Sequence, residues 1–194
     1  MIAAGSGQNG RVREISWRQV WEADLTADDH EQLRLLLTQL FGREGAGEWG
    51  HSWAAGRPDL RLVGYDGDDA VAHIAVAPRF VLVGGRPLLV GDTGLVGVRP
   101  SHRGTGLGLD LLARHAALVR GLELPFAFLT CTDRTTSFYV RGGWRLLPRS
   151  VRVTQLPPRG IVARACEDAA MVLPGTSGVD AWPDGDITRN GYEI

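Results

Sequence analysis

Several residue types that would define a special class of protein are scarce in this chain. Its 194 residues include only two cysteines, Cys131 and Cys166, too few for a disulfide scaffold or a four-ligand zinc site. No apolar run approaches the roughly 20 residues that span a bilayer. The first ten residues hold no apolar segment of the signal-peptide type. We therefore expect a cytoplasmic protein with no membrane span.

Neither sign of charge is in excess. The chain has 21 basic and 22 acidic residues, for a formal net charge of -1. This leaves no basic surplus to hold a phosphate backbone, which argues against a nucleic-acid partner. No cluster of His, Cys, Asp or Glu has the spacing of metal ligands, so no metal is expected.

Length and composition predict one globular domain. A domain commonly has roughly 100–200 residues, and the contents of 44% hydrophobic and 22% charged residues are ordinary for a folded protein. Residues 1–10 contain three glycines and no periodicity, and we expect a flexible start there. Residues 11–194 are expected to form the single domain. The unusual number is 26 glycines.

The apolar pattern predicts a mixed α/β sheet. Thr26 is expected to cap the first helix and Gly42 to end it. Turn residues at 66–69 and 84–85 join three strands into an antiparallel meander. The one crossover expected to be parallel is the strand–helix–strand unit of residues 88–131. The predicted strands are residues 12–21, 60–65, 70–83, 88–98, 125–131, 149–156 and 169–173, and the predicted helices are residues 26–42, 107–119 and 135–141.

A glycine-rich loop before the second helix carries the main chemical signal. Residues 98–108 read VRPSHRGTGLG. Glycines let the backbone curl around an anion, and the first N–H groups of the helix point at it. The loop lacks the acidic ribose ligand of a dinucleotide fingerprint and the Lys-Ser/Thr of a P-loop. It predicts a pyrophosphate cradle made by Val98, Arg103, Gly104, Thr105, Gly106, Leu107 and Gly108.

Two motifs in order resemble the GNAT N-acyltransferase superfamily. The spacing Arg-x-x-Gly-x-Gly from Arg103 is similar to its coenzyme A loop, and residues 138–144, FYVRGGW, resemble its Phe-Tyr-x-x-x-Gly-aromatic segment. The resemblance implies a GNAT-fold domain, with a mostly antiparallel mixed sheet and helices on both faces. It also implies acyl- or acetyl-coenzyme A as co-substrate.

A closer resemblance, to the nodulation protein A family, runs along almost the whole chain. That family places a fatty acyl chain on the free amino group of a de-N-acetylated chitin oligosaccharide. His73 and the pattern Trp182-x-x-Gly185-Asp186 are also similar to aminoglycoside 2'-N-acetyltransferases. Both branches imply an amino group on a sugar as acceptor. The matching positions include Trp17, Trp21, Glu22, Ser52, Trp53, Arg57, Gly64, Tyr65, Ala72, His73, Arg79, Phe80, Pro125, Phe126 and Arg189.

The donor and the assembly stay open at this point. Nodulation acyltransferases are thought to take fatty acyl from a carrier protein, whose phosphopantetheine resembles the end of coenzyme A. The fuller loop of residues 103–108 favours coenzyme A itself. An aminoglycoside-type N-acetyltransferase using acetyl-coenzyme A is one alternative, and a non-catalytic acyl-coenzyme A sensing module is another. A homodimer is also open.

The resemblance implies roles for three catalytic candidates. Asp92, in a predicted strand that borders the active site in the superfamily, is the expected base for the acceptor ammonium. His73 is a second candidate base, although a lone histidine on a strand is more often structural. Tyr139 falls where the superfamily places the acid for the coenzyme A thiolate. Cys131 is expected to pack, because transfer in the superfamily is usually direct.

Three further residues are expected to bind the acceptor. Trp53, in a loop with two other aromatic residues, offers a ring face to a sugar, although core packing explains it equally well. Asp186 is expected to hold the acceptor amine, by analogy with the acetyltransferase branch, and otherwise would be a solvated charge. Trp182 belongs to the same tail motif and completes the set.

Overall fold

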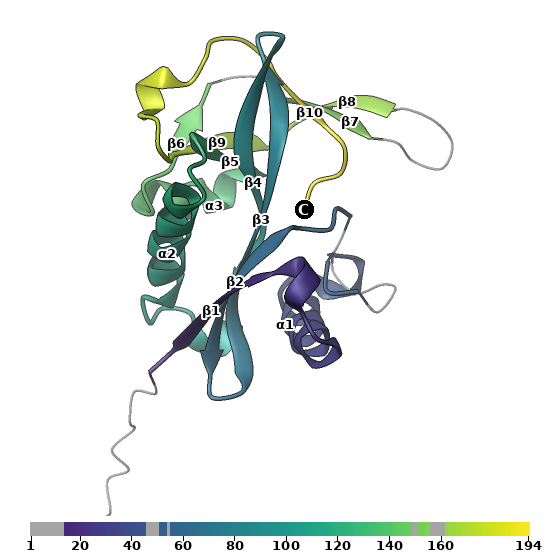
Figure 1. Ribbon diagram of the computed structural model, residues 1–194, viewed down its shortest axis with the longest axis vertical. Helices are drawn as coiled ribbons and strands as arrows, with labels where there is room; N and C mark the ends of the chain where they lie inside the picture. The colour runs from purple at the N-terminus through teal and green to yellow at the C-terminus, as the bar shows by residue number, and fades with distance from the viewer. Residues whose placement is uncertain (1–13, 46–50, 54, 149–150, 156–161) are drawn as a thin grey trace, which may run out of the picture.

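The computed structural model describes residues 14–45, 51–53, 55–148, 151–155 and 162–194. These residues build one ten-stranded sheet with three α-helices (Figure 1). The strands are β1 Ser16–Trp21, β2 Leu60–Asp66, β3 Asp69–Val83, β4 Arg86–Val98, β5 Phe126–Cys131, β6 Arg145–Leu147, β7 Val151–Gln155, β8 Val162–Cys166, β9 Ala169–Pro174 and β10 Ile187–Asn190. The helices are α1 Ala27–Gly45, α2 Leu107–Gly121 and α3 Asp133–Arg141, with short 3₁₀ turns at Glu22–Asp24, Pro100–His102 and Val179–Ala181.

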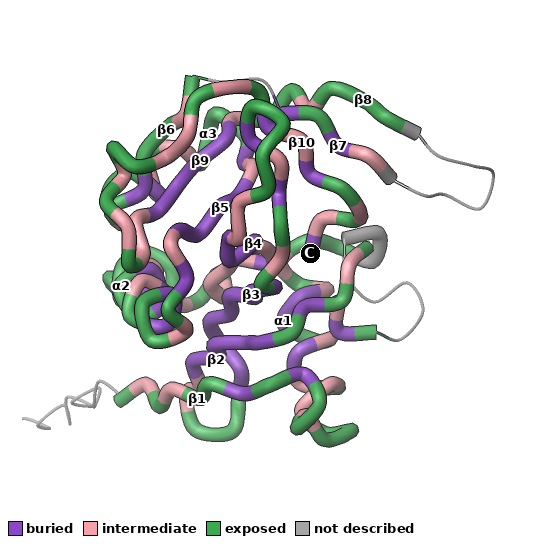
Figure 2. The backbone as a smooth tube through the Cα atoms, turned by 45° about the horizontal axis from the view of Figure 1, so that its top comes forward, coloured by how far each residue is buried: buried purple, intermediate pink, exposed green. Residues whose placement is uncertain are grey.

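Strand β3 is the organising strand of the sheet. It pairs with β4 along nearly its whole length, with β2 through its first half, and with β10 at its end. The sheet continues in the order β6-β9-β5-β4-β3-β10-β7-β8. Residues 70–77 of β3 are all buried, as expected for a strand that is covered on both faces. Figure 2 shows the buried backbone concentrated in these central strands.

The helices lie on both faces of the sheet, as the superfamily resemblance implies (Figure 1). Helices α2 and α3 cover one face, where Leu111, Leu112 and Trp144 belong to the largest apolar cluster. Helix α1 covers the other face through Leu33, Leu36 and Leu37. Each helix buries an apolar stripe, which is the main source of its stability in a protein.

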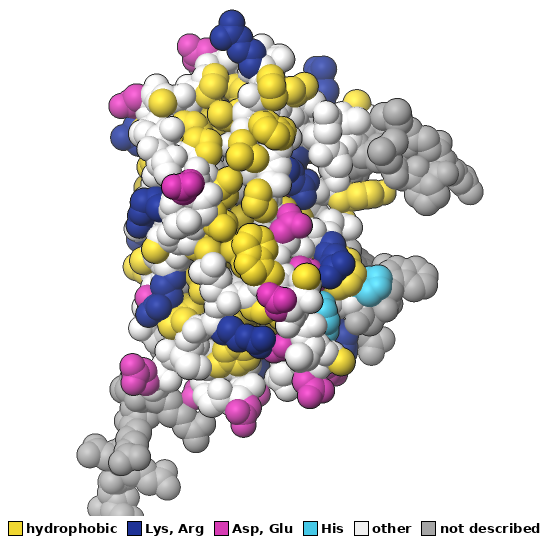
Figure 3. All heavy atoms as spheres, viewed as in Figure 1, with side chains coloured by type: hydrophobic (Ala, Val, Ile, Leu, Met, Phe, Trp, Pro, Cys, Tyr) yellow, Lys and Arg dark blue, Asp and Glu magenta, His cyan; other side chains and the backbone are white. Residues whose placement is uncertain are grey.

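Charges of both signs are scattered over the surface. Figure 3 shows basic and acidic side chains interspersed on one face, with no block of a single sign. This matches the net charge of -1. No helix among the described residues is long and apolar enough to cross a membrane.

Strands β4 and β5 run parallel but separate after a short contact. They pair only where Gly91 faces Ala127 and Asp92 faces Phe128. Beyond this point β4 is irregular, because its register against β3 shifts and Leu95 takes a positive φ of 51°. A positive φ is uncommon for a branched residue and indicates a local constraint. The separation opens a gap in the middle of the sheet.

The last residues of the chain cross β4 on the α1 face. The N–H of Gly56 donates to the carbonyl of Glu193 over 2.8 Å, and Ile194 packs with Leu95 and Leu37. A Cβ atom at Gly94 would collide with the carbonyl oxygen of Ile194. Glycine at position 94 therefore allows this segment to lie flat on the strand.

Most predicted elements are confirmed, including the meander and the parallel crossover. Thr26 caps α1: its Oγ1 accepts from the N–H of Asp29 over 3.2 Å, while Asp29 accepts from the N–H of Thr26. The prediction missed β6, β8 and β10. Strand β6 has only three residues, and in β10 the buried inward position after Ile187 is Arg189, a charge that hides the apolar alternation. Three predictions fall partly or wholly outside the described residues: the flexible start at residues 1–10, residues 12–13 of the first strand, and residues 149, 150 and 156 of a late strand.

The close approach at Gly94 can be tested by adding one methyl group. We expect Gly94→Ala to lower the free energy of unfolding by about 1–3 kcal/mol, as overpacking commonly does, because the terminal segment must move off β4. Gly178→Ala is the matched control, since a Cβ atom there meets nothing within 4 Å. Urea unfolding measures both variants. Equal stability of the two proteins would show that the segment does not lie on Gly94.

Two buried histidines should make stability depend on pH. Burial lowers the pKa of both His73 and His115 to about 3, whereas an unfolded histidine titrates near 6.5. Between these values the unfolded chain binds more protons, so stability falls as the pH falls from 7.5 towards 3. From pH 7.5 to 5.5 each histidine should remove about 1.4 kcal/mol. His115→Gln should abolish its share of that loss in urea unfolding; an unchanged loss would contradict the assignment.

Candidate active site

The glycine-rich loop forms an open turn at the start of α2, with the geometry expected of an anion cradle. Gly104 and Gly106 have φ values of 78° and 90°, a conformation that glycine adopts without strain. Gly106 is the N-cap residue, and no side chain caps the helix. The first N–H groups of α2 have no partner within the helix, and together with the helix dipole they suit a phosphate group.

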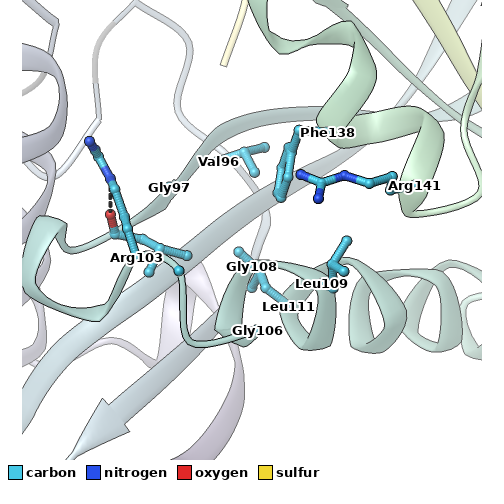
Figure 4. Close-up of a pocket in the computed structure, with 11 residues that line it drawn as sticks. Val96, Gly97, Arg103, Gly106, Gly108, Leu109, Leu111, Phe138 and Arg141 are labelled. Carbon is cyan, nitrogen blue, oxygen red and sulfur yellow. Dashed lines mark hydrogen bonds between the residues drawn. The ribbon is translucent and has the colours of Figure 1, made fainter.

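A cavity of about 510 Å³ lies over this cradle (Figure 4). Figure 4 shows Phe138 and Arg141 reaching from α3 towards the first turns of α2. The Nε of Arg103 donates to the carbonyl of Val98 over 3.1 Å, which anchors one of the two guanidinium groups in the cavity wall. A Cβ atom at Gly108 would lie 3.0 Å from the ring of Phe138, so this glycine lets α3 approach α2. The wall is thus basic and rich in backbone N–H groups, which fits a pyrophosphate.

Five of the seven predicted cradle residues line this cavity, and two do not. The five are Val98, Arg103, Gly104, Gly106 and Gly108. Thr105 turns its hydroxyl to the carbonyl of His102 over 2.8 Å, and Leu107 is buried in the apolar cluster under the helix. Both line a separate hollow beside β1 instead. In a tight loop successive side chains point in different directions, so the spacing could not assign each residue to the cavity.

A second cavity of about 330 Å³ fills the gap between β4 and β5. It is lined by residues 93–96 of β4, residues 129–132 at the end of β5, and Tyr139 of α3. It shares Val96 with the first cavity, and the consecutive residues Phe138 and Tyr139 wall one cavity each. The two cavities therefore adjoin at Val96, and together they are called the groove. The terminal residues Glu193 and Ile194 close its far end.

Tyr139 lies at the wall of the second cavity, where the sequence predicts an acid. Its ring packs edge-on against Phe138 and Trp144, with centroids 5.2 and 5.7 Å away. Burial is the main cause that raises the pKa of Tyr139, and the negative charge of Glu193 adds to this shift. The hydroxyl therefore stays protonated at neutral pH and can donate a hydrogen bond into the cavity.

Cys131 lines the same cavity at the end of β5. Burial raises the pKa of its thiol. A thiol nucleophile needs a lowered pKa or an adjacent base. The environment of Cys131 therefore favours packing, in line with the sequence expectation.

His73 is not exposed to either cavity, which argues against the predicted role as a base. It is fully buried, and its pKa falls to about 3 through burial and the nearby charge of Arg61. Its Nδ1 donates to the carbonyl of Leu95 over 2.7 Å, and its Nε2 faces a guanidinium nitrogen of Arg61 at 3.3 Å. Arg61 in turn donates to Glu22 over 2.6 Å. The neutral imidazole therefore braces the irregular turn of β4 at Leu95.

Asp92 is likewise sealed from the groove. Its side chain is 0% exposed and points to the face of the sheet opposite α2, where it lies 3.4 Å from Arg189 and 3.3 Å from Arg79. Burial raises the pKa of Asp92, while Arg189 and Arg79 oppose this shift. A carboxylate enclosed by two guanidinium groups has no access to a substrate amine. The predicted base, Asp92, is therefore separated from the cavity.

Glu193 is the carboxylate that the structure brings to the cavity and the sequence did not single out. Its side chain is 40% exposed and lies 3.2 Å from Arg189, and it accepts from the hydroxyl of Thr130 over 2.7 Å. Glu193 follows β10 in a stretch without periodicity, so no local signal marked it. Its position depends on the path of the last residues across β4.

The three predicted acceptor contacts have different fates. Trp53 stacks on His51 at 4.4 Å and packs on the cluster that contains Leu95 and Ile194, which also line the second cavity. Trp182 instead packs on Phe126 and Phe128, at 5.1 and 6.0 Å, in the core. Asp186 is exposed, and its backbone carbonyl accepts from the N–H of Gly84, which lies in the turn between β3 and β4. Only Trp53 is therefore close to the groove.

No group of three His, Cys, Asp or Glu side chains that could hold a metal ion occurs within the described ranges. The groove contains instead backbone N–H groups, two guanidinium groups, a tyrosine hydroxyl and a carboxylate. Such a set can bind a phosphorylated, amide-bearing thioester at one end and a cationic group at the other.

Known proteins resemble this chain in sequence and in fold. The sequence model of the family described as Nodulation protein A matches residues 12–194. Nodulation protein A of Azorhizobium caulinodans is 36% identical over 94% of this chain and 86% of its own length. The protein of the same name from Methylobacterium nodulans is 31% identical over 99% of this chain and 96% of its own.

Solved structures share the fold at low sequence identity. An acyl-CoA N-acyltransferase from Pseudomonas aeruginosa has a TM-score of 0.57 at 20% identity and covers 82% of this chain and 99% of its own. A GNAT family N-acetyltransferase from Escherichia coli, solved in complex with CoA, has a TM-score of 0.57 at 17% identity and covers 90% and 88%.

These likenesses confirm the GNAT fold that the two motifs implied. The family match extends over all the elements that build the groove. This chain belongs to the nodulation protein A family and is an N-acyltransferase.

Proposed function

We propose that this chain transfers an acyl group from acyl-coenzyme A directly to the primary amine of an amino sugar. The observation that carries the proposal is the pair of adjoining cavities, one over the glycine-rich loop at the start of α2 and one with an apolar lining between β4 and β5. The pyrophosphate of the donor would bind the N–H groups of α2. The pantetheine arm would then run along the gap and place the thioester beside Tyr139.

The second cavity suits the acyl group and the reaction centre. Phe41, Leu95, Leu129 and Ile194 give it an apolar lining that can cover a hydrocarbon chain. Binding both substrates in one groove brings the amine to the thioester carbonyl, and such positioning is a large part of catalysis in direct transfers. The amine nitrogen forms a bond to the carbonyl carbon, the carbon–sulfur bond breaks, and the amine loses one proton.

Tyr139 and the irregular segment of β4 at Leu95 would assist this step. The hydroxyl of Tyr139 would donate a hydrogen bond to the sulfur as it leaves with negative charge. The carbonyl of Leu95 is held by His73 over 2.7 Å, which keeps the N–H groups of this irregular segment in a constant direction. Because the thiol of Cys131 stays protonated, we expect direct transfer to the amine without an acyl-enzyme intermediate on Cys131.

The amino-sugar acceptor is supported by the resemblance to the family and by two residues at the second cavity. A carboxylate lies at the end of the groove for a cation, and the ring of Trp53 packs against the adjoining cluster. A phosphopantetheine on an acyl carrier protein would enter the same groove, so the carrier protein is a second donor to test. We place the reaction in the cytoplasm, and a homodimer remains part of the hypothesis.

The cradle assignment predicts the effect of a charge at the start of α2. Gly106→Glu should weaken the binding of coenzyme A more than tenfold in calorimetry, because the carboxylate repels the pyrophosphate and strains a backbone with φ of 90°. Gly178→Glu makes the same charge change at an open surface position and should leave the affinity within twofold. Thermal unfolding confirms that both variants are folded. Equal affinity in both would refute the cradle.

The donor and the acceptor are tested together in one panel of substrates. Acyl-coenzyme A from acetyl to palmitoyl, and the same acyl groups on a carrier protein, are each offered with glucosamine oligomers, N-acetylglucosamine oligomers and aminoglycosides. We expect an N-acylated product from the free-amine oligomers and none from the N-acetylated ones. Turnover confined to acetyl donors and aminoglycosides would favour the aminoglycoside-type N-acetyltransferase instead. Binding of donor without transfer to any amine would favour a sensing module.

A further inference from the structure

The proposed reaction needs a group that receives a proton, and among the described residues that line the second cavity Glu193 is the one with an acidic side chain. A primary amine is largely an ammonium ion at neutral pH and must lose a proton before it attacks. Asp92 and His73, which the sequence predicts as bases, are both 0% exposed and line neither cavity. Glu193 is 40% exposed and lies in the cavity wall with Tyr139 and Cys131.

Glu193 is held in one orientation by both of its carboxylate oxygens. Oε1 accepts from the hydroxyl of Thr130 in β5 over 2.7 Å, and Oε2 lies 3.2 Å from a guanidinium nitrogen of Arg189. A carboxylate has about four acceptor positions, so each oxygen keeps capacity for a further donor. Because Glu193 lines the cavity and its side chain is 40% exposed, a substrate group in the cavity can be that donor.

Arg189 is in turn fixed from behind by Asp92. Its side chain is fully buried in β10, 3.4 Å from Asp92, and its guanidinium lies 5.9 Å from the ring of Phe128. A buried guanidinium needs a carboxylate partner to offset the loss of water. Since Asp92 provides that partner, Arg189 can orient Glu193 at the cavity without drawing it into the core. The backbone of Glu193 is also anchored, because its carbonyl accepts from Gly56 over 2.8 Å.

We propose that Glu193 binds the acceptor ammonium and takes its proton, while Arg189 and Asp92 act as positioning residues for Glu193. The inference rests on the proposed acyl transfer. The proton passes from nitrogen to the Glu193 carboxylate, and the nitrogen lone pair attacks the thioester carbonyl carbon. The carbon–sulfur bond then breaks, and the sulfur leaves as a thiolate hydrogen-bonded to Tyr139. The nitrogen loses a second proton as the amide forms, so that one of the two protons neutralises the thiolate and the other passes from Glu193 to water.

The electrostatic surroundings of Glu193 agree with this role. The groups that face it are Arg189, with Asp92 behind, and the neutral Tyr139 and Cys131 across the cavity. Glu193 contributes to the raised pKa of Tyr139, after the larger effect of burial. The carboxylate and the hydroxyl are therefore close enough to interact, with one suited to accept a proton and the other to donate a hydrogen bond.

The test compares Glu193→Gln with Glu193→Asp. The control is Glu167→Gln, which makes the same chemical change at an exposed residue after β8. With the free-amine glucosamine oligomer and its best acyl donor, Glu193→Gln should lower kcat/KM about 10²–10⁴-fold, the usual effect of losing a general base. Its affinity for coenzyme A should stay within twofold. Glu193→Asp keeps the charge and should recover part of the activity, and Glu167→Gln should equal the wild type.

The pH profile separates a proton acceptor from a structural residue. Without the carboxylate, only acceptor molecules that are already deprotonated can react. The activity of Glu193→Gln should therefore rise about tenfold per pH unit below the pKa of the amine, and the deficit should shrink at high pH. Thermal unfolding confirms that the variant is folded.

The possible outcomes are distinct. A Glu193→Gln enzyme as active as the Glu167→Gln control would overturn the inference while the proposed function stands. An equal deficit at every pH would also overturn it, because it indicates a packing role. If the wild type transfers no acyl group to any amine although it binds coenzyme A, the proposed function fails and this inference fails with it.

Discussion

The separation of β4 from β5 is the constraint on which the rest of this structure depends. The two strands share only the pairs at Gly91 and Asp92, and the departure of β4 is fixed by the positive φ of Leu95 and by the hydrogen bond of His73 to its carbonyl. Backbone N–H and C=O groups that leave a ladder need other partners. The pantetheine arm of the proposed donor has two amide groups that would supply them, so the proposed site depends on the backbone of the gap as well as on its side chains.

Buried charges hold the two sides of this gap in place. On the side of α1, Arg61 joins Glu22 to His73. Behind β4, Arg189 lies 3.4 Å from Asp92. Buried ion pairs add little net stability, because the loss of hydration offsets the attraction, but breaking one is strongly destabilising. In this protein the buried ion pairs orient two groups at the gap, the backbone turn at Leu95 and the carboxylate of Glu193.

The local motifs could be predicted from the sequence because their chemistry is contained in a few adjacent residues. The positive φ of Gly104 and Gly106, the cap at Thr26 and the parallel crossover all follow from short patterns. Burial could not be predicted in the same way. Asp92 stands in a strand with no sign of its two arginine partners, of which Arg189 is 97 residues away. A base was therefore expected at a position that the fold seals from substrate.

The sequence by itself determined the fold class, the anion cradle at the start of α2 and the tyrosine that follows β5, because each depends on local backbone geometry or on a motif with fixed spacing. The tertiary structure alone decided which carboxylate reaches the groove. Asp92 and Glu193 are indistinguishable as isolated acids, yet one is 0% and the other 40% exposed. The difference arises because the last residues of the chain fold back across Gly94, a contact that no short-range pattern encodes.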